Sequence, residues 1–177
     1  DSKTTVKEQR NKRRHNSPSK NLEKKLAKYV LNTSADDLDF VLLGIVCQEN
    51  QYQAVSSVND VLGTRLLLSD FIPLNLKGGK IFKFSLYHFL DEELGLEYFL
   101  IPNNSNFEEP NIHANANNDL FGDVTIEESV KLVKELPKTD YFIILKGEDI
   151  HNYQFKIVDK LKEVSEFIQV QTIETTE

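Results

Sequence analysis

Residues 140–147 read DYFIILKG, and the rest of the chain is best interpreted outward from this stretch. Its middle is an uninterrupted run of large apolar residues that includes two isoleucines, and it ends at Gly147. A short apolar run of this kind, closed by a glycine, is typical of a strand that is buried on both faces. The segments on either side have helical spacing, so the sequence predicts a central strand between two helices.

The two flanking helices are predicted from caps and apolar spacing. Before the strand, Thr125 and Glu128 have the spacing of a capping box, and apolar residues continue at helical intervals until Pro137 ends the pattern. After the strand, Asp149 can cap a helix whose apolar residues recur every three to four positions. The alternating stretch 167–173 is then the last predicted strand.

The first half of the chain adds a second buried strand and a third helix. Residues 40–47 read FVLLGIVC, which is again an apolar run of strand length. Residues 50–62 place apolar side chains on one helical face, with Asn50 at the cap and Gly63 where a left-handed glycine commonly ends a helix. A short strand at 66–68 is expected to follow.

A hairpin and a loop occupy the middle of the chain. Apolar and polar residues alternate along 81–90, and an acidic turn leads to a second strand at 96–101. His88 falls in the inward-facing series of the first strand and is expected to be a satisfied histidine rather than a base. Residues 103–123, rich in asparagine, predict a loop.

This order of elements predicts an α+β fold with one mostly antiparallel sheet and helices packed on one face. Two strand–helix–strand units flank the hairpin, so we expect a ferredoxin-like arrangement with an added hairpin. A chain of 177 residues fits one domain, which we assign to residues 26–177. Residues 1–25 are polar without apolar periodicity and are predicted to be a basic disordered tail.

Charge divides the chain into a basic arm and an acidic body. Residues 1–28 contain ten Lys or Arg and three Asp or Glu, whereas residues 29–177 contain eleven and twenty-five, so +7 and −14 give the net charge of −7. An acidic body repels nucleic acid and anionic membranes, whereas the arm is suited to phosphate contacts. Its candidate binding residues are Lys7, Arg10, Lys12, Arg13, Arg14 and Lys20.

No motif in the sequence indicates catalysis, a metal or a nucleotide. Cys47 is the single cysteine and lies in an apolar run, which favours a small core residue over a nucleophile or a ligand. The four histidines lack metal-chelating spacing, and the sequence has no phosphate-binding loop or nucleophile elbow. Apolar runs of about 18 residues, which would span a membrane, are also missing. We therefore expect no catalytic residue, no metal and no cofactor, in a cytoplasmic protein.

The stretch 133–141, VKELPKTDY, resembles the motif that names the IPExxxVDY family, a set of small bacterial proteins without an assigned function. The matching residues are Glu135, Asp140 and Tyr141. The sequence departs from the motif where Lys134 replaces proline and Thr139 replaces valine. The similarity extends over residues 26–177 and implies no activity. We expect structural roles for the matching residues, with Glu135 at a helix end and the other two at a strand entrance.

Three functions stay open on this basis. The favoured one is a non-catalytic protein-binding or adaptor module, because the chain has a complete core but no chemical constellation. The first alternative is an RNA- or ribosome-associated factor that uses the basic arm. The second is a small-molecule-sensing regulatory domain, with its ligand between helices or at a dimer edge. A homodimer is compatible with each of them, and an enzyme is the least favoured class.

Overall fold

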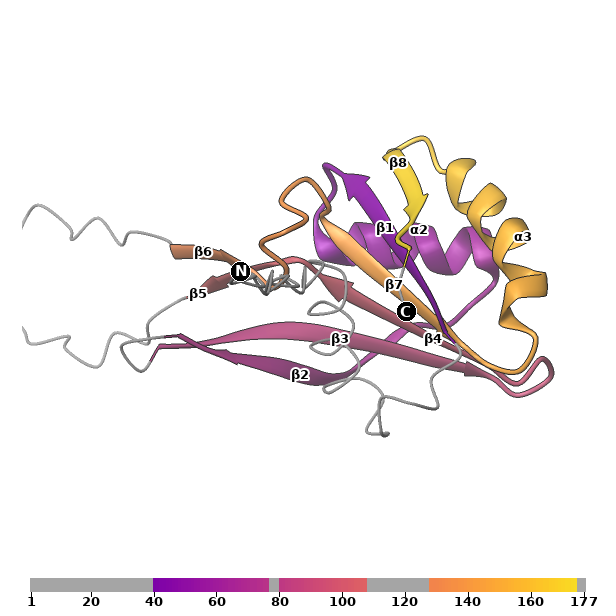
Figure 1. Cartoon of the computed structure of the whole chain (residues 1–177), viewed down its shortest axis with the longest axis horizontal. Coiled ribbons are helices and arrows are strands. Elements are labelled where there is room, and N and C mark those ends of the chain that lie inside the picture. The colour runs from indigo at the N-terminus through magenta and orange to yellow at the C-terminus, as the bar shows by residue number, and fades with distance from the viewer. Residues whose placement is uncertain (1–39, 77–79, 108–127, 175–177) are drawn as a thin grey trace, which may run out of the picture.

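The computed structural model describes residues 40–76, 80–107 and 128–174. It confirms the expected α+β class, since these residues form a six-stranded antiparallel sheet with two helices, and a two-stranded ribbon lies at one end of the sheet (Figure 1). In chain order the elements are β1 (Phe40–Cys47), α2 (Gln51–Leu62), β2 (Leu67–Asn75), β3 (Ile81–Asp91), β4 (Leu96–Pro102), β5 (Asn104–Phe107), β6 (Glu128–Lys131), β7 (Tyr141–Lys146), α3 (Ile150–Lys162) and β8 (Phe167–Thr172).

The predicted central strand is confirmed as β7. The strand order is β2-β3-β4-β7-β1-β8, and β7 pairs with β1 on one side and β4 on the other. Ile143 lies opposite Leu43 of β1 and Leu100 of β4, and all three side chains are at most 1% exposed. Burial on both faces therefore explains why this segment lacks polar alternation.

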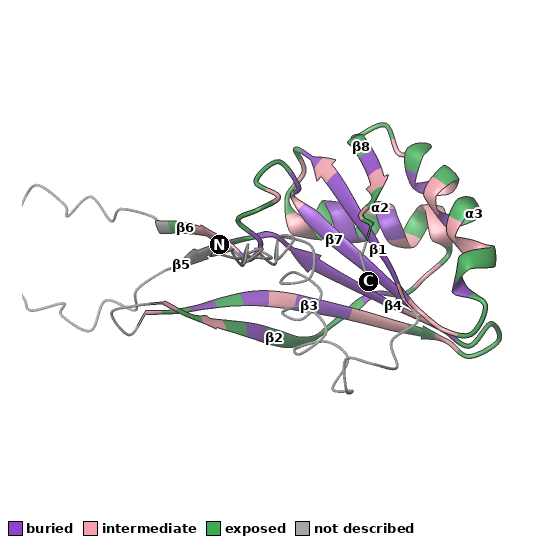
Figure 2. Ribbon diagram, in the orientation of Figure 1, coloured by how far each residue is buried: buried purple, intermediate pink, exposed green. Residues whose placement is uncertain are grey.

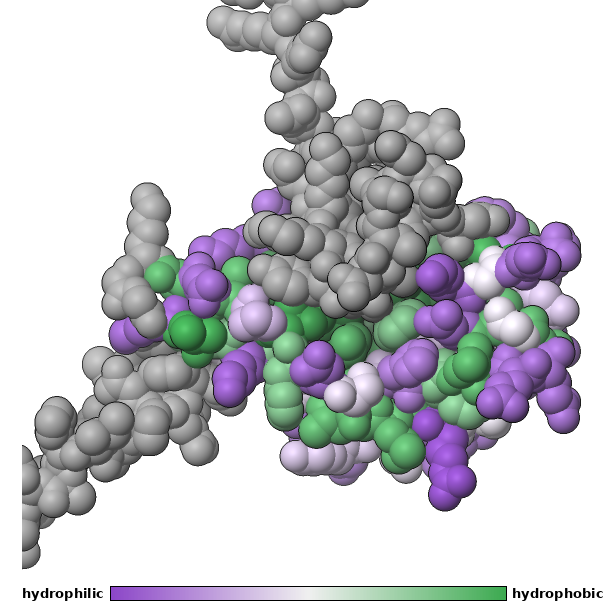
Figure 3. Space-filling model, turned by 90° about the horizontal axis from the view of Figure 1, so that it is seen from below, coloured by the Kyte–Doolittle hydropathy of each residue, from purple (hydrophilic) through white to green (hydrophobic). Residues whose placement is uncertain are grey.

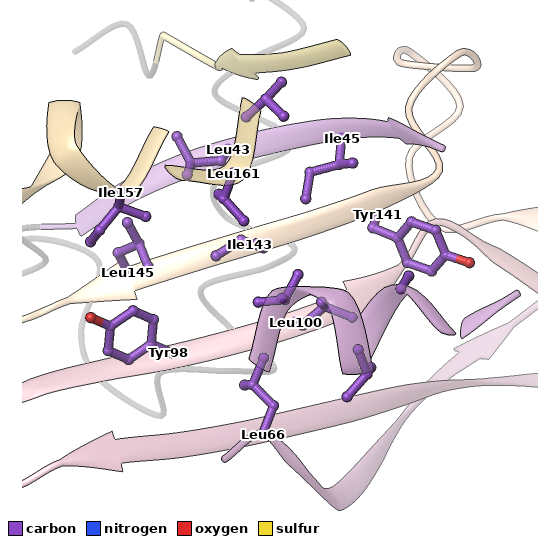
Figure 4. Packing of buried hydrophobic residues seen from close by; sticks show 14 of the residues in the cluster. Leu43, Ile45, Leu66, Tyr98, Leu100, Tyr141, Ile143, Leu145, Ile157 and Leu161 are labelled. Atoms are coloured by element: carbon purple, nitrogen blue, oxygen red, sulfur yellow. The ribbon is translucent and has the colours of Figure 1, made fainter. Parts of the chain in front are cut away.

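Both helices cover the same face of the sheet. Odd-numbered residues of β7, such as Ile143 and Leu145, pack in one cluster with Val55 of α2 and with Ile157 and Leu161 of α3 (Figure 4). We call this face the helix side. Figure 2 shows that β1, β4 and β7 are buried along most of their length, whereas β2 and α3 carry many exposed residues. The helix-side core thus lies mainly over β4, β7 and β1.

The other face of the sheet, the opposite side, has its own apolar cluster. It contains Phe142 and Ile144 of β7 together with Phe82 and Phe84 of β3. Residues 132–139 contribute Leu132 and Val133 to this cluster, with both side chains nearly fully buried, and Thr139 is also buried. This segment closes part of the face that the helices leave uncovered.

The helix predicted before β7 is wrong in the described residues. Residues 128–131 form β6, which pairs with β5, and residues 132–140 form turns and irregular backbone. Val130 and Val133, which suggested a helical face, instead pack in the opposite-side cluster. Burial against the sheet therefore overrides the local helical pattern.

The other expected elements mostly agree with the structure. The hairpin is confirmed as β3 and β4, and Asn50 and Gly63 end α2 as expected, the glycine with φ 71°. Asp149 stands at the start of α3 with φ 57°, but its side chain makes no capping hydrogen bond. The strand predicted at 66–68 extends to Asn75, and β5 occupies part of the predicted loop. The predicted tail at 1–25 lies outside the described residues.

The connections between strands interleave two strand–helix–strand units. Helix α3 joins β7 to β8, and β1 lies between these two strands in the sheet. After β1 the chain forms α2, then the antiparallel pair β2–β3, and then β4. In the sheet, β7 lies between β1 and β4. The structure confirms the sequence expectation at the level of the α+β class with a mostly antiparallel sheet.

Candidate functional site: a polar hollow at the ends of three strands

A hollow of about 790 Å³ lies where β1 and β4 end and β7 begins. Its walls come from the connection between β1 and α2, from the entrance of β7 and from residues that follow β4. Lys83 and Ser85 of β3 also line it. The hollow therefore gathers segments that are far apart in the sequence, including the Asp140–Tyr141 pair of the motif.

The position of α2 follows from the cap at its first turn. The Asn50 side-chain oxygen accepts hydrogen bonds from the backbone N–H groups of Tyr52, at 3.0 Å, and Gln53, at 3.1 Å. These two donors would otherwise be unsatisfied at the helix start. The cap fixes the turn after β1, and the first turn of α2 borders the hollow.

Asp140 ties together the strands that meet at the hollow. Its Oδ2 accepts a hydrogen bond from the backbone N–H of Cys47 at 3.0 Å, and its own backbone N–H donates to the carbonyl of Ile45 at 2.9 Å. Its Oδ1 lies 3.7 Å from Nζ of Lys131, at the end of β6. The carboxylate therefore joins the start of β7 to β1 and β6.

Tyr141 packs its ring into the helix-side core while its hydroxyl points out of it (Figure 4). The residue is 6% exposed, and the hydroxyl donates a hydrogen bond to the carbonyl of Glu49 at 2.6 Å. Burial raises the pKa of Tyr141 to about 12, and the nearby Cys47, Asp140 and Glu49 add to the rise. The phenol is therefore neutral at physiological pH and is committed as a donor.

Cys47 is held as an unreactive thiol. It is 5% exposed, and its sulfur accepts a hydrogen bond from the N–H of Glu49 at 3.3 Å. Burial raises the pKa of the Cys47 thiol, and the negative charges of Glu49, Asp140 and Glu166 raise it further, against the lowering effect of that hydrogen bond. A thiolate is the nucleophilic form, so this environment opposes nucleophilic chemistry.

Asn103 anchors the segment that carries part of the hollow, a role absent from the sequence predictions. Its side chain is fully buried, and Nδ2 donates to the carbonyls of Thr139, Leu136 and Val133 at 2.8, 3.1 and 3.4 Å. Its Oδ1 accepts the N–H of Val133 at 2.8 Å, and its backbone N–H donates to the carbonyl of Asp140 at 2.7 Å. The position of Asn103 directly after a strand is the one feature that distinguishes it from the neighbouring asparagines.

Two exposed aromatic residues are direct neighbours of residues that line the hollow, and we call the part of its border beside them the rim. Tyr52 is 73% exposed and follows Gln51, which lines the hollow. Phe71 of β2 is 48% exposed and lies directly opposite Ser85, another lining residue. Figure 3, seen from the side on which β2 lies, shows hydrophobic side chains gathered among hydrophilic ones.

Tyr87 connects the two rim residues. Burial raises its pKa, Tyr52 raises it further, and a hydrogen bond with Ser85 lowers it. Tyr52 therefore lies close enough to influence the pKa of Tyr87, which also forms a hydrogen bond with Ser85. Phe71 is the cross-strand neighbour of Ser85, so both exposed aromatics neighbour the Tyr87–Ser85 pair.

The structure places the sequence-predicted residues unequally. Asp140 and Tyr141 meet at the hollow, whereas Glu135 is exposed in a turn rather than at a helix end. The binding residues proposed in the arm, Lys7 to Lys20, lie outside the described residues. His88 stacks on Phe99 with the ring centroids 4.7 Å apart, and its Nε2 lies 3.6 Å from Oε2 of Glu97. Within the described residues this nitrogen is buried without a hydrogen bond, so the prediction of a satisfied histidine is wrong.

The described residues hold no group of three His, Cys, Asp or Glu side chains that could bind a metal ion. In the same part of the chain, neither helix has the length and apolar character needed to cross a membrane. No protein-family model matches the sequence, and a search of curated proteins finds no match. The site is thus defined by its geometry: a polar hollow whose Cys, Asp and Tyr side chains are engaged in structural contacts.

Proposed function

We propose that this chain is a non-catalytic protein-binding module and that its partner docks at the hollow. The observation that carries the proposal is the pair of aromatic side chains, Tyr52 and Phe71, which stand exposed at its rim. Aromatic residues beside a concavity are the typical anchors of protein interfaces. Apolar surface rimmed by polar residues commonly marks an interaction site.

The engaged state of the polar residues supports binding rather than chemistry. Cys47 and Tyr141 have raised pKa values, and Asp140 accepts a backbone hydrogen bond and pairs with Lys131. A nucleophile or general base needs a pKa near the working pH and a free path to its substrate. These residues stabilise the segments that line the hollow, and we assign recognition of the partner to the aromatic residues at the rim.

The partner is expected to contact side chains rather than the backbone edge of β2. This edge strand contains Pro73, which has no N–H to offer, and its register shifts between Leu68 and Asp70. Proline and bulges both discourage the addition of a further strand. Phe71 is therefore proposed to act as an apolar anchor.

The test is capture of partners by the full chain, followed by affinity measurements on variants. We expect Tyr52→Ala and Phe71→Ala each to weaken binding about tenfold or more, as for interface anchors. Phe155→Ala is the matched control, because Phe155 is an exposed aromatic on the other helix, 75% against 73% for Tyr52. Equal affinity for the rim variants and the wild type would refute the proposal.

A second candidate function, small-molecule sensing, is favoured by the size of the hollow. About 790 Å³ falls within the range of roughly 300–1,000 Å³ typical of ligand pockets. A thermal-shift screen with metabolites would detect it, since a ligand of the folded state raises the melting temperature. A hit that is abolished by Lys83→Ala but not by Phe155→Ala would favour this function over protein binding.

We also propose that the fold is a ferredoxin-like relative with an added hairpin, and that the chain is related to the IPExxxVDY proteins. The interleaved units β1–α2 and β7–α3–β8 support the first proposal. The structural contacts of Asp140 and Tyr141 are compatible with the second. Neither relationship supplies an activity, so the proposed function rests on the rim.

A further inference from the structure

The two faces of the sheet are covered in different ways. Two helices pack on the helix side, whereas the described residues place no helix on the opposite side. Among those residues, the buried apolar side chains that the opposite-side cluster receives from outside the strands are Leu132 and Val133. Yet Leu42, Phe99 and Ile144 on this side are 1%, 6% and 1% exposed. An apolar sheet face needs a second packed layer, of which residues 132–139 supply a part.

The cover from residues 132–139 follows the end of β1. Asp140 binds the backbone of Cys47, and the side chain of Thr139 lies beside Gly44. The start of β1 lies at the other end of the strand, where Phe40 is half-buried and packs against the opposite-side cluster. The missing part of the second layer is therefore expected over the start of β1 and the end of β7.

The chain that leads into Phe40 has the sequence and the length to fill this place. Residues 22–31 read LEKKLAKYVL, in which Leu22, Leu26, Tyr29 and Val30 share one helical face. As a helix, these ten residues would be about 15 Å long, which is roughly the width of three strands. Residues 32–39 can span up to roughly 26–29 Å, whereas β3 lies three strand spacings, about 14 Å, from β1.

The segment between β5 and β6 is attached at the wrong end of the sheet for this role. Residues 108–127 connect Phe107 to Glu128, which are direct partners in the two-stranded ribbon. Figure 1 shows this ribbon at one end of the molecule and the start of β1, beside the β3–β4 turn, at the other. The position of attachment therefore favours residues 22–31.

Charge favours the same segment. Residues 20–31 contain four Lys and one Glu, a net charge of +3. Residues 91–97, in and after the β3–β4 turn, contain four Asp or Glu and no Lys or Arg. Even with Lys146, the cross-strand partner of Glu97, this end of the sheet has a net charge of −3. Opposite charges at this separation attract each other at physiological salt.

We propose that residues 22–31 of this chain dock as an amphipathic helix on the opposite side of the sheet, over the start of β1 and the end of β7. A helix of ten residues is only marginally stable in water, so the contact with the sheet is what stabilises it. The rim lies on the helix side, because Tyr87 packs in the helix-side core and Phe71 is opposite Ser85. The docked helix therefore leaves the proposed partner site open.

Hydrogen exchange of the full chain, followed by NMR at each amide, tests this proposal. We expect the amides of residues 26–31 to exchange at least about tenfold more slowly than in an unstructured peptide, at the same rate in dilute and concentrated samples. Leu26→Asp should abolish this protection. Leu31→Asp is the matched control, because it is the same substitution in the same segment but on the other side of the helix, and protection should stay within about twofold of the wild type.

Contacts between methyl groups provide a measurement that needs no variant. Nuclear Overhauser effects are expected from Leu26 and Val30 to Leu42 and Ile144. Unprotected amides in the wild type, or protected amides without these contacts, would overturn the proposal. Protection that grows with concentration would assign the segment to a second copy and would also overturn it, as would equal loss of protection in both aspartate variants. Partner binding at the rim should survive Leu26→Asp, so failure of either proposal can be recognised separately.

Discussion

Replacement of Asn103 by aspartate tests whether one buried amide holds the segment before β7. The change is nearly isosteric, so it leaves no cavity. It replaces a donor nitrogen, which faces the carbonyls of Thr139 and Leu136 at 2.8 and 3.1 Å, with an acceptor oxygen. These two hydrogen bonds and the longer one to the carbonyl of Val133, at 3.4 Å, are lost, and the new oxygen repels the carbonyl oxygens that it faces.

The expected cost follows from the donors that these buried carbonyls lose, although the carbonyl of Leu136 keeps the N–H of Thr139 as a second donor. Each buried carbonyl that loses its donor costs about 1–3 kcal/mol, and burial of a carboxyl group adds to this. We expect Asn103→Asp to lower the free energy of unfolding by about 4 kcal/mol. This is a large part of the roughly 5–15 kcal/mol that stabilises a domain. The melting temperature should fall by roughly 8–16 °C.

Urea unfolding followed by far-ultraviolet circular dichroism provides the measurement, because the chain has no tryptophan for fluorescence. Asn104→Asp is the control at the next position, where the side chain is exposed and contacts Ser129. Its cost should stay below about 1 kcal/mol, as for most surface substitutions. A difference between the two variants smaller than about 1 kcal/mol would refute the assigned role of Asn103.

Three further predictions concern a turn, a titration and a thiol. Gly147→Ala should lower the free energy of unfolding in urea by about 3 kcal/mol, because the new Cβ would lie 2.7 Å from the carbonyl oxygen of Gly95. Gly63→Ala is the control and should cost about 1 kcal/mol, because the space around Gly63 is open. Equal costs for the two variants would contradict this. The wild type should lose about 2 kcal/mol of stability as the pH rises from 10 to 12, because the unfolded chain releases the Tyr141 proton first, and Tyr141→Phe should lose less. Cys47 should react with Ellman's reagent only as fast as the protein unfolds, so rapid reaction of the folded chain would show that the thiol is accessible.

The sequence predicts those elements whose local pattern and tertiary environment agree. β7 and β1 are buried on both faces, so their composition alone marks them as strands. Asn50 and Gly63 bound α2 by local hydrogen bonds and backbone geometry, which depend little on the rest of the fold. For such segments the sequence carries the whole signal.

Prediction fails where a contact distant in sequence decides the structure. Val133 belongs to an apparent helical face, but its backbone is bound by Asn103, 30 positions earlier, and its side chain is buried against the sheet. Ile168 alternates with Val170 along the predicted last strand, yet with the register shift at the start of β8 it is 65% exposed. The rim of the hollow has the same origin, because Tyr52 and Phe71 become neighbours of lining residues through the helix and the sheet rather than through a local motif.

The base of the segment between β4 and β7 is closed by its own backbone. The N–H of Asn103 donates to the carbonyl of Asp140 at 2.7 Å, so the chain leaves the sheet and returns at the same point. Phe107 and Glu128 are also direct partners across β5 and β6. A two-residue hairpin turn could therefore join them in place of residues 108–127, and the shorter loop would lower the entropy cost of closure. This position is thus a natural graft point, where foreign peptides could be displayed without altering the pairing of the main sheet.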